Sequence, residues 1–158
     1  MRNLPGVRYK KMALTPDLGV WILRYRNTPH FVTPWKMAGK LEVSVQVDGE
    51  LGQGLAHRSG KTYAAGEIFA LNPGNLCREF LASAQQSGTQ VGFLIRPDAC
   101  EQGRFPTASA GYDKRLYELA RWIADDDPSP EELRHEVPCS LDSFVQRNLT
   151  RGKTDGLM

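Results

Sequence analysis

The chain has 158 residues, a length that suits one domain with a small appendage. Hydrophobic residues make up 41% of it and charged residues 24%, so the chain has enough apolar side chains for a packed core and need not be disordered. The formal net charge of +2 is too small to indicate a nucleic-acid or acidic-membrane partner by itself.

The cysteines and the first residues favour a reducing compartment. Cys77, Cys100 and Cys139 are odd in number and far apart, so the sequence predicts neither a disulfide framework nor a CxxC zinc site. The basic residues near the start are not followed by the apolar region of a signal peptide, and no apolar run approaches a membrane span. We predict a soluble, cytoplasmic protein with no membrane partner.

The first part of the chain is predicted to be an arm followed by a strand. Residues 1–17 are polar and contain the structure breakers Pro5-Gly6 and Thr15-Pro16-Asp17. We therefore expect an amino-terminal arm that is mobile or folds over the domain. The segment GVWILRYR, residues 19–26, predicts a first strand whose two faces carry different side chains.

The segment KLEVSVQVD, residues 40–48, is the clearest strand. Apolar residues alternate with polar ones at period two, which predicts one buried face and one polar face. Asp48-Gly49 is typical of a hairpin turn, so residues 49–56 are expected to return beside this strand. A short strand over residues 62–64 follows.

The segment GEIFALNPGNLCREF, residues 66–80, predicts a strand, a tight turn and a second strand. The turn, Asn72-Pro73-Gly74-Asn75, suits type II, because proline presets φ at its second position and glycine tolerates a positive φ at its third. By propensity, residues 76–86 could instead form a helix, and this alternative stays open. With a last strand over residues 90–96, the region holds about seven or eight short strands, which is typical of a sandwich or barrel.

The composition changes after the strands. Residues 99–111 are rich in Gly, Pro, Ser and Thr and are expected to be a linker. Residues 113–124 predict a helix, because apolar residues recur at i, i+3, i+4 and i+7. A capping box that begins at Ser129 predicts a second helix, which we expect to end before Pro138, and a third helix is expected from Ser140.

The first of these helices has more apolar surface than one barrel contact is expected to cover. Exposed patches of that kind usually mark an interface, and two-fold pairing is the commonest way to bury one, so we predict a homodimer. The residues predicted to form its interface are Leu116, Leu119, Trp122 and Ile123. The rival hypothesis is a helix that packs entirely on its own barrel and leaves a monomer.

Few residues are arranged for catalysis or metal binding. The three histidines, His30, His57 and His135, form no HxH pair, and each is expected to be a surface or packed residue rather than a ligand. Cys77 could pair with His30 as nucleophile and base, but a small buried side chain is the favoured interpretation. The sequence has no GxSxG, P-loop or GxGxxG motif. We predict no catalytic residue, no metal and no cofactor.

The segment of residues 66–80 also resembles the second motif of the cupin family, which is a glycine, an acidic residue, apolar residues, Pro-Gly, a short gap and a histidine. Gly66-Glu67, Phe69 and Pro73-Gly74 stand in those places, and Cys77 stands at or near the place of the metal-binding histidine. The resemblance implies a mainly β fold, a cupin-like double-stranded β-barrel or jelly roll. The missing histidine puts a metal site in doubt.

A barrel of this kind, preceded by an arm and followed by helices, resembles the amino-terminal domain of AraC-type transcription regulators. In that family the domain binds a small effector and dimerises through its helices. Residues 119–152 also resemble the family's first helix-turn-helix, with Trp122-Ile123 ending one helix, residues 130–133 starting the next and Ser140 starting the recognition helix. Arg134 departs from the family, which prefers alanine there.

The charge of the helical segment opposes contact with DNA. Residues 112–158 hold seven Lys and Arg against ten Asp and Glu, a net charge of −3, whereas nucleic-acid affinity comes mainly from basic residues. We therefore favour a helical hairpin that packs on the barrel or pairs two subunits. DNA is expected as a partner only if a further DNA-binding segment is present.

These interpretations give four segments and a function. The segments are an arm over residues 1–17, a cupin-like barrel over 18–98, a linker over 99–111 and a helical part over 112–152. The predicted function is small-molecule sensing and dimerisation as a module of an AraC-like regulator, and the alternative is a small stand-alone cupin enzyme, metal-dependent or an isomerase. The side chains expected to bind the effector are Arg24, Trp35, Glu42, Phe69, Arg78 and Phe80.

Overall fold

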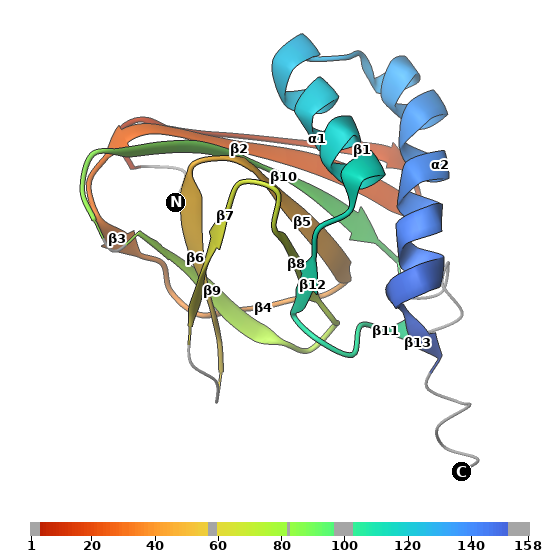
Figure 1. Ribbon diagram of the computed structural model, residues 1–158, viewed down its shortest axis with the longest axis horizontal. Helices are drawn as coiled ribbons and strands as arrows, with labels where there is room; N and C mark the ends of the chain where they lie inside the picture. The colour runs from red at the N-terminus through yellow and green to blue at the C-terminus, as the bar shows by residue number, and fades with distance from the viewer. Residues whose placement is uncertain (1–3, 57–59, 82, 97–102, 152–158) are drawn as a thin grey trace.

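The computed structural model describes residues 4–56, 60–81, 83–96 and 103–151. Two β-sheets form a barrel, and two helices lie side by side against the outside of the larger sheet (Figure 1). The expected fold class, mainly β with a helical carboxyl-terminal segment, is confirmed.

The larger sheet has six strands in the order β1-β2-β10-β5-β8-β12, and every neighbouring pair is antiparallel. One face of this sheet packs against the helices and the other lines the barrel interior. The strands are β1 (Val7–Thr15), β2 (Leu18–Thr28), β10 (Gln86–Ile95), β5 (Leu41–Asp48), β8 (Ile68–Leu71) and β12 (Ser109–Gly111).

The smaller sheet forms the opposite wall of the barrel in the order β3-β9-β6-β7, and the short strand β4 also pairs with β9. Its strands are β3 (Phe31–Val32), β4 (Lys36–Met37), β9 (Leu76–Leu81), β6 (Glu50–Leu55) and β7 (Lys61–Ala64). A separate two-stranded ribbon joins β11 (Gly103–Arg104) to β13 (Thr150–Arg151) after the last helix.

The predictions of an amino-terminal arm and a linker are wrong in part, because each segment contributes a strand. β1 pairs along β2, from Val7 opposite Tyr25 to Thr15 opposite Leu18, and the side chain of Leu14 is buried in the core. The charged residues of β1 concealed this strand, since charged side chains suit a sheet edge that faces solvent. In the expected linker, β12 adds to the far edge of the same sheet beside β8.

Two predicted hairpins are corners between the sheets instead. β5 and β6 meet at Asp48-Gly49, yet β5 pairs with β10 and β8 whereas β6 pairs with β7 and β9. The turn at residues 72–75 has Gly74 at φ +91°, as a type II turn requires, but it links β8 of the larger sheet to β9 of the smaller one. The helical alternative for residues 76–86 is wrong over Leu76–Leu81, which is β9.

The helices begin where their capping residues predict. α1 (Lys114–Asp126) starts at Asp113, whose carboxylate accepts the backbone N–H of Leu116 at 2.9 Å. α2 (Pro130–Asn148) starts at the predicted capping box, in which the Ser129 hydroxyl accepts the backbone N–H of Glu132 at 3.2 Å. Both termini therefore satisfy backbone donors that a helix leaves free.

The predicted break near Pro138 is wrong, because α2 continues through this proline as one helix. A single helix leaves no turn before Ser140, so the arrangement of helices expected from the helix-turn-helix resemblance is not formed. Arg134 instead ties α2 to the barrel, since its Nε donates to the backbone carbonyl of Leu14 on β1 at 2.9 Å.

The apolar stripe of α1 packs on its own barrel. Leu116, Leu119 and Ile123 are buried in one core cluster with strand residues such as Val45, and Trp122 packs partly buried against the same cluster. The prediction that Leu116, Leu119 and Ile123 form a dimer interface is therefore corrected, because these side chains are covered within the chain, whereas the prediction for Trp122 stays a prediction.

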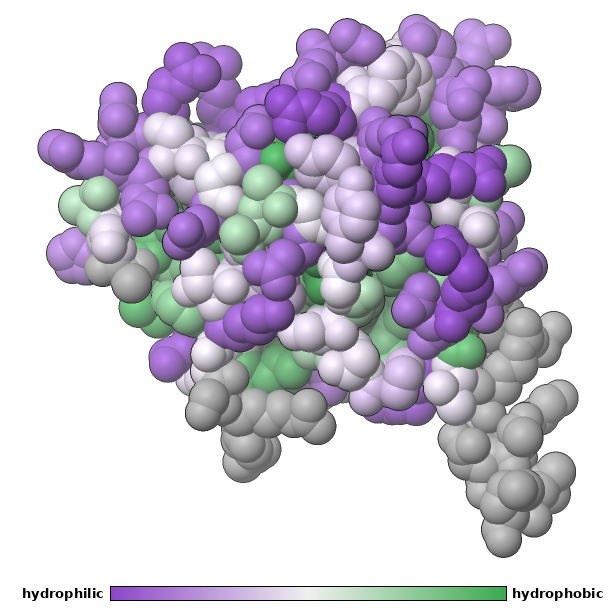
Figure 2. Space-filling view, in the orientation of Figure 1, coloured by the Kyte–Doolittle hydropathy of each residue, from purple (hydrophilic) through white to green (hydrophobic). Residues whose placement is uncertain are grey.

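The surface differs between the two parts of the fold. Hydrophilic side chains gather over the helices, and hydrophobic ones surface in patches over the barrel (Figure 2). Neither helix of the described part of the chain combines the length and the apolar character that crossing a membrane requires.

Candidate ligand site in the barrel

The interior of the barrel is polar as well as apolar. The residues of β5 that alternate with its valines are polar as predicted, but they face the barrel rather than solvent: Ser44 and Gln46 are buried, and Gln46 donates to the Tyr25 hydroxyl at 3.0 Å. Burial of such groups is costly unless they find partners, and the Gln46 amide nitrogen also donates to the Asp48 carbonyl at 2.8 Å.

A cavity of about 370 Å³ opens between the two sheets, and we name it the barrel cavity. β1, β2 and β5 of the larger sheet form one side, and β9, β4 and the segment between β3 and β4 form the other. Its volume lies within the range of small-molecule sites. The residues that line it are Tyr9, Trp21, Leu23, Thr33, Pro34, Trp35, Lys36, Glu42 and Glu79.

Glu42 and Trp21 form the polar contact on the larger-sheet side of the cavity. The indole Nε1 of Trp21 donates to Glu42 Oε1 at 2.8 Å. Burial raises the pKa of the Glu42 carboxyl, while the Trp21 hydrogen bond and the charge of Lys36 act in the opposite direction without cancelling it. The carboxyl thus accepts a proton more readily than an exposed glutamate.

Lys36 and Glu79 form the polar contact on the smaller-sheet side. Lys36 Nζ lies 2.9 Å from Glu79 Oε1, and the Thr33 hydroxyl donates to Glu79 Oε2 at 3.1 Å. Burial lowers the pKa of Lys36, but the charge and hydrogen bond of Glu79 outweigh that effect, so the pKa is raised. The ion pair leaves little net charge on this side of the cavity.

Cys77 occupies the place that the family motif gives to a metal-binding histidine. It is buried and pairs in register with Lys36, and burial raises the pKa of its thiol to about 11. A divalent cation needs deprotonated ligands, whereas this position offers a protonated thiol opposite an ammonium. These residues do not fit a cupin metal.

The histidines do not add to this site. His30 is exposed between β2 and β3, and the side chain of His135 on α2 is 85% exposed, whereas His57 lies outside the described residues. Within the ranges that the structure describes, no three His, Cys, Asp or Glu side chains are grouped to hold a metal ion.

Three of the six residues predicted to bind an effector lie at or beside the cavity. Trp35 and Glu42 line it. Arg78 lies on the outer face of β9, where its guanidinium is 4.4 Å from the centre of the Trp35 ring, a cation–π contact that holds the indole at the cavity rim.

The other three predicted residues lie elsewhere. Phe80 covers Gly52 on the outer face of the smaller sheet, and Phe69 is buried in a separate cluster, edge to face with Tyr63 at 5.2 Å. Arg24 is on the helix side of β2, where it donates to the backbone carbonyl of Ala124 at 2.6 Å. The interpretation of these three as barrel ligands is therefore wrong.

Sequence reasoning missed Tyr9, Lys36 and Glu79. Alternation along β9 could have found Glu79, because it shares a face with Cys77 and Leu81. No pattern marks Lys36, which lies in a two-residue strand, and Tyr9 lies in the segment interpreted as an arm.

Comparison with known proteins supports the fold. No family model and no curated protein matches the sequence. Among solved structures, an RmlC-like cupin family protein with a double-stranded β-helix fold from Methanocaldococcus jannaschii is 12% identical, with a TM-score of 0.50 over 63% of this chain and 89% of that chain. A putative mannose-6-phosphate isomerase from Ralstonia eutropha is 10% identical, with a TM-score of 0.50 over 60% of this chain and 88% of that chain. The chain therefore has a cupin-like β-barrel fold followed by two helices.

Proposed function

We propose that the chain is a cytoplasmic small-molecule sensing module of an AraC-like transcription regulator, with the effector bound in the barrel cavity. The observation that carries the proposal is the cavity itself, about 370 Å³ in volume, with the aromatic side chains of Tyr9, Trp21 and Trp35 on its walls. Apolar and aromatic walls with a few placed polar groups are the usual composition of a small-molecule site.

The charges in the cavity favour an uncharged effector. Lys36 and Glu79 neutralise each other at 2.9 Å, and the raised pKa of Glu42 disfavours its charged form. A planar molecule with hydrogen-bonding groups suits these walls, because it can stack on Trp35 and bond to Glu42 or Thr33. An ionic effector would have to separate the Lys36–Glu79 pair first.

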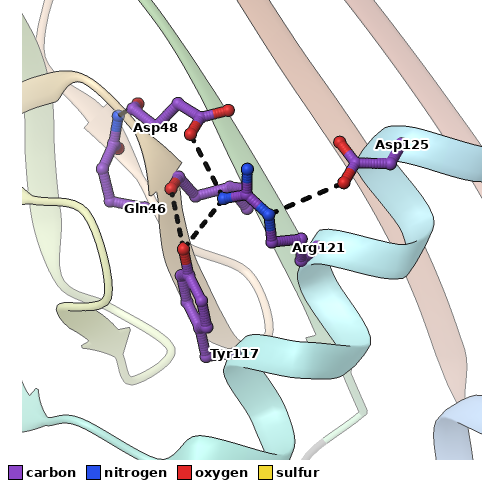
Figure 3. A network of polar contacts seen from close by, with 6 residues as sticks. Gln46, Asp48, Tyr117, Arg121 and Asp125 are labelled. Atoms are coloured by element: carbon purple, nitrogen blue, oxygen red, sulfur yellow. Dashed lines mark hydrogen bonds and ion pairs between the residues drawn. The ribbon is translucent and has the colours of Figure 1, made fainter.

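Strand β5 supplies a route from the cavity to the helices. Glu42 faces the cavity near one end of β5, and the other end meets α1 through two contacts (Figure 3). The hydroxyl of Tyr117 donates to the Val47 carbonyl at 3.4 Å, and Arg121 forms an ion pair with Asp48 at 3.3 Å. An effector that binds one position of β5 better than another would shift the population of α1 positions.

Dimerisation is part of the same proposal, through a surface other than the buried stripe of α1. Sedimentation of the wild-type chain at micromolar concentration tests it directly. A species of two-chain mass supports the dimer, and a one-chain mass at every concentration removes it from the proposal.

The sensing proposal is tested by titrating a panel of uncharged aromatic and heteroaromatic metabolites while following tryptophan fluorescence and melting temperature. We expect at least one compound to give saturable changes in the wild type. Glu42→Gln and Trp35→Ala should weaken that binding by about tenfold each, because each removes a contact to the bound molecule.

Trp122→Phe is the matched control, because Trp122 lies on α1 outside the cavity and its loss should leave the affinity unchanged. If no compound shifts either signal, or if Trp122→Phe weakens binding as much as Trp35→Ala, the proposal fails. A bound compound that is converted to a product, detected by chromatography, would favour the enzyme alternative.

A further inference from the structure

A second hollow, about 820 Å³ in volume, lies outside the barrel on the helix side of the larger sheet, where α1 ends. Its side-chain walls include Arg8, Arg24, Arg26, Asp48, Thr89 and Asp125. Neighbouring β2 side chains alternate between the two faces of the sheet, so Arg24 opens to this hollow whereas Leu23 lines the barrel cavity. The two sites are therefore separated by the sheet.

The register of the strands brings the basic side chains together. Arg8 on β1 stands directly opposite Arg24 on β2, Thr89 on β10 stands opposite Arg24 on its other side, and Arg26 follows two residues later on the same face. Earlier on that face of β2, Ile22 is buried beneath the helices. The face therefore changes from apolar to basic where the helices no longer cover it.

The acidic groups around the hollow are already engaged. Arg121 on α1 lies 3.3 Å from Asp48 and 3.6 Å from Asp125, and Figure 3 shows its guanidinium between the two carboxylates. Arg24 covers the Ala124 carbonyl at 2.6 Å, which compensates the negative end of the helix dipole. Among the residues that the structure describes, Arg8 and Arg26 form no ion pair, so their charges remain available.

We propose that this hollow, which we name the arginine site, binds a small phosphate-bearing molecule. Guanidinium groups present parallel N–H donors that match pairs of phosphate oxygens, and the Thr89 hydroxyl can add a further hydrogen bond. Three neighbouring cations also repel one another, and a bound anion relieves that repulsion.

The shape and the rim of the arginine site favour a compact anion over a nucleic-acid strand. Asp48 and Asp125 stand at the wall, and Asp126 and Asp127 follow at the end of α1, so an extended polyanion would meet carboxylates on leaving the hollow. A single phosphate group has no chain that must pass these carboxylates.

The test is calorimetric titration of the full chain with inorganic phosphate in chloride buffer, repeated with Arg8→Gln/Arg26→Gln. Both side chains are exposed, so the double variant should fold normally. We expect saturable binding with a dissociation constant of about millimolar or below, weakened at least about tenfold in the double variant.

Lys40→Gln/Lys114→Gln is the matched control, because it removes the same number of positive charges at two other positions, just before β5 and at the start of α1. It should change the affinity by less than about twofold, since exposed charges at that distance are screened. Absence of saturable binding overturns the proposal, as does an equal loss in the control.

A single-stranded oligonucleotide serves as the competing probe. If it binds the wild type more tightly than phosphate does and loses that binding in Arg8→Gln/Arg26→Gln, the site serves a polyanion and the small-ligand proposal is overturned. We expect it to bind no better than phosphate. These outcomes are independent of the barrel cavity, which neither double variant touches.

Discussion

The indole ring of Trp21 lies directly against Gly92, its cross-strand partner in the larger sheet, so closely that a Cβ atom added at Gly92 would overlap the ring. The N–H of the same ring donates to the carboxylate of Glu42 at 2.8 Å. Glu42 lies on β5, which is separated from β2 by β10. Only a residue without a side chain leaves room for this arrangement. Gly92 thus fixes one wall of the barrel cavity, although it contributes no side chain to it.

We therefore expect Gly92→Ala to displace Trp21 and to lower the free energy of unfolding by about 1–3 kcal/mol, the usual cost of overpacking a core. Urea unfolding measures this cost, and near-ultraviolet circular dichroism reports the loss of the fixed indole environment. Gly39→Ala is the matched control, because no atom lies within 4 Å of a Cβ at that position. A Gly92→Ala chain as stable as the control would show that the ring is not confined there.

Glu42 should make the free energy of unfolding fall as the pH rises, an effect that an exposed glutamate would not have. Burial raises its pKa, so the folded chain binds this proton more tightly than the unfolded chain does. The stability that this proton contributes is fully present below the pKa of Glu42 in the unfolded chain, about 4.3. It is lost as the pH rises through the pKa of Glu42 in the folded chain. The unfolding free energy of the wild type should therefore fall relative to that of Glu42→Gln across this range.

Urea unfolding at pH steps between about 4 and 7 checks the sign. Glu67→Gln provides a control of opposite sign, because a backbone hydrogen bond from Ala64 and the hydrogen bond from Lys61 lower the pKa of Glu67. Its contribution is present above the unfolded pKa and is lost as the pH falls. If the difference in unfolding free energy between the wild type and Glu42→Gln does not change with pH, the burial of Glu42 is contradicted.

Local signals in the sequence predicted local structure well. The alternation of residues 40–48 predicted β5, and the capping box at Ser129 predicted the start of α2, because each pattern acts within a few residues. Pairing was harder to predict. Asp48-Gly49 permits a positive φ at Gly49 in a hairpin and in a corner alike, and only the distant strands β10 and β9 decide which forms.

The candidate site was predictable only in part. Trp35 and Glu42 were found by residue type and strand position. Lys36 was not found, because it is placed at the cavity by the short strand β4, in which Lys36 pairs with Cys77 and Met37 with Leu76 of β9. This pairing depends on the closure of the whole barrel. Arg24 was assigned to the wrong face, since the sequence shows that Trp21 and Arg24 face opposite ways but not which side the helices cover.

The continuous helix α2 predicts a stabilising substitution at Pro138. Proline has no N–H to donate to the carbonyl four residues earlier, and its ring crowds that carbonyl, so an interior proline weakens a helix by about 3 kcal/mol. The ring of Pro138 is partly buried, and its loss offsets part of the gain. We expect Pro138→Ala to raise the free energy of unfolding by about 1–2 kcal/mol.

The measurement is the midpoint of urea unfolding with an unchanged slope. Asp142→Ala, an exposed position on the same helix, separates this effect from the general helix preference of alanine and should give about 0.5 kcal/mol. A decrease in stability for Pro138→Ala would mean that the core around α2 depends on the proline ring.

The two cysteines that the structure describes, Cys77 and Cys139, should differ strongly in reactivity. Cys77 is only 2% exposed, and this burial raises the pKa of its thiol to about 11. Cys139 is exposed on α2. The thiolate is the reactive form, so at about pH 8 a disulfide reagent should modify Cys139 at least about a hundredfold faster. The experiment uses a Cys100→Ser background, which leaves these two thiols, and follows the release of the reagent's chromophore. Adding Cys139→Ser should abolish the fast phase, and urea should expose the remaining thiol at once. A fast phase that persists in the doubly substituted chain would show that Cys77 is reachable and ionised in the folded barrel.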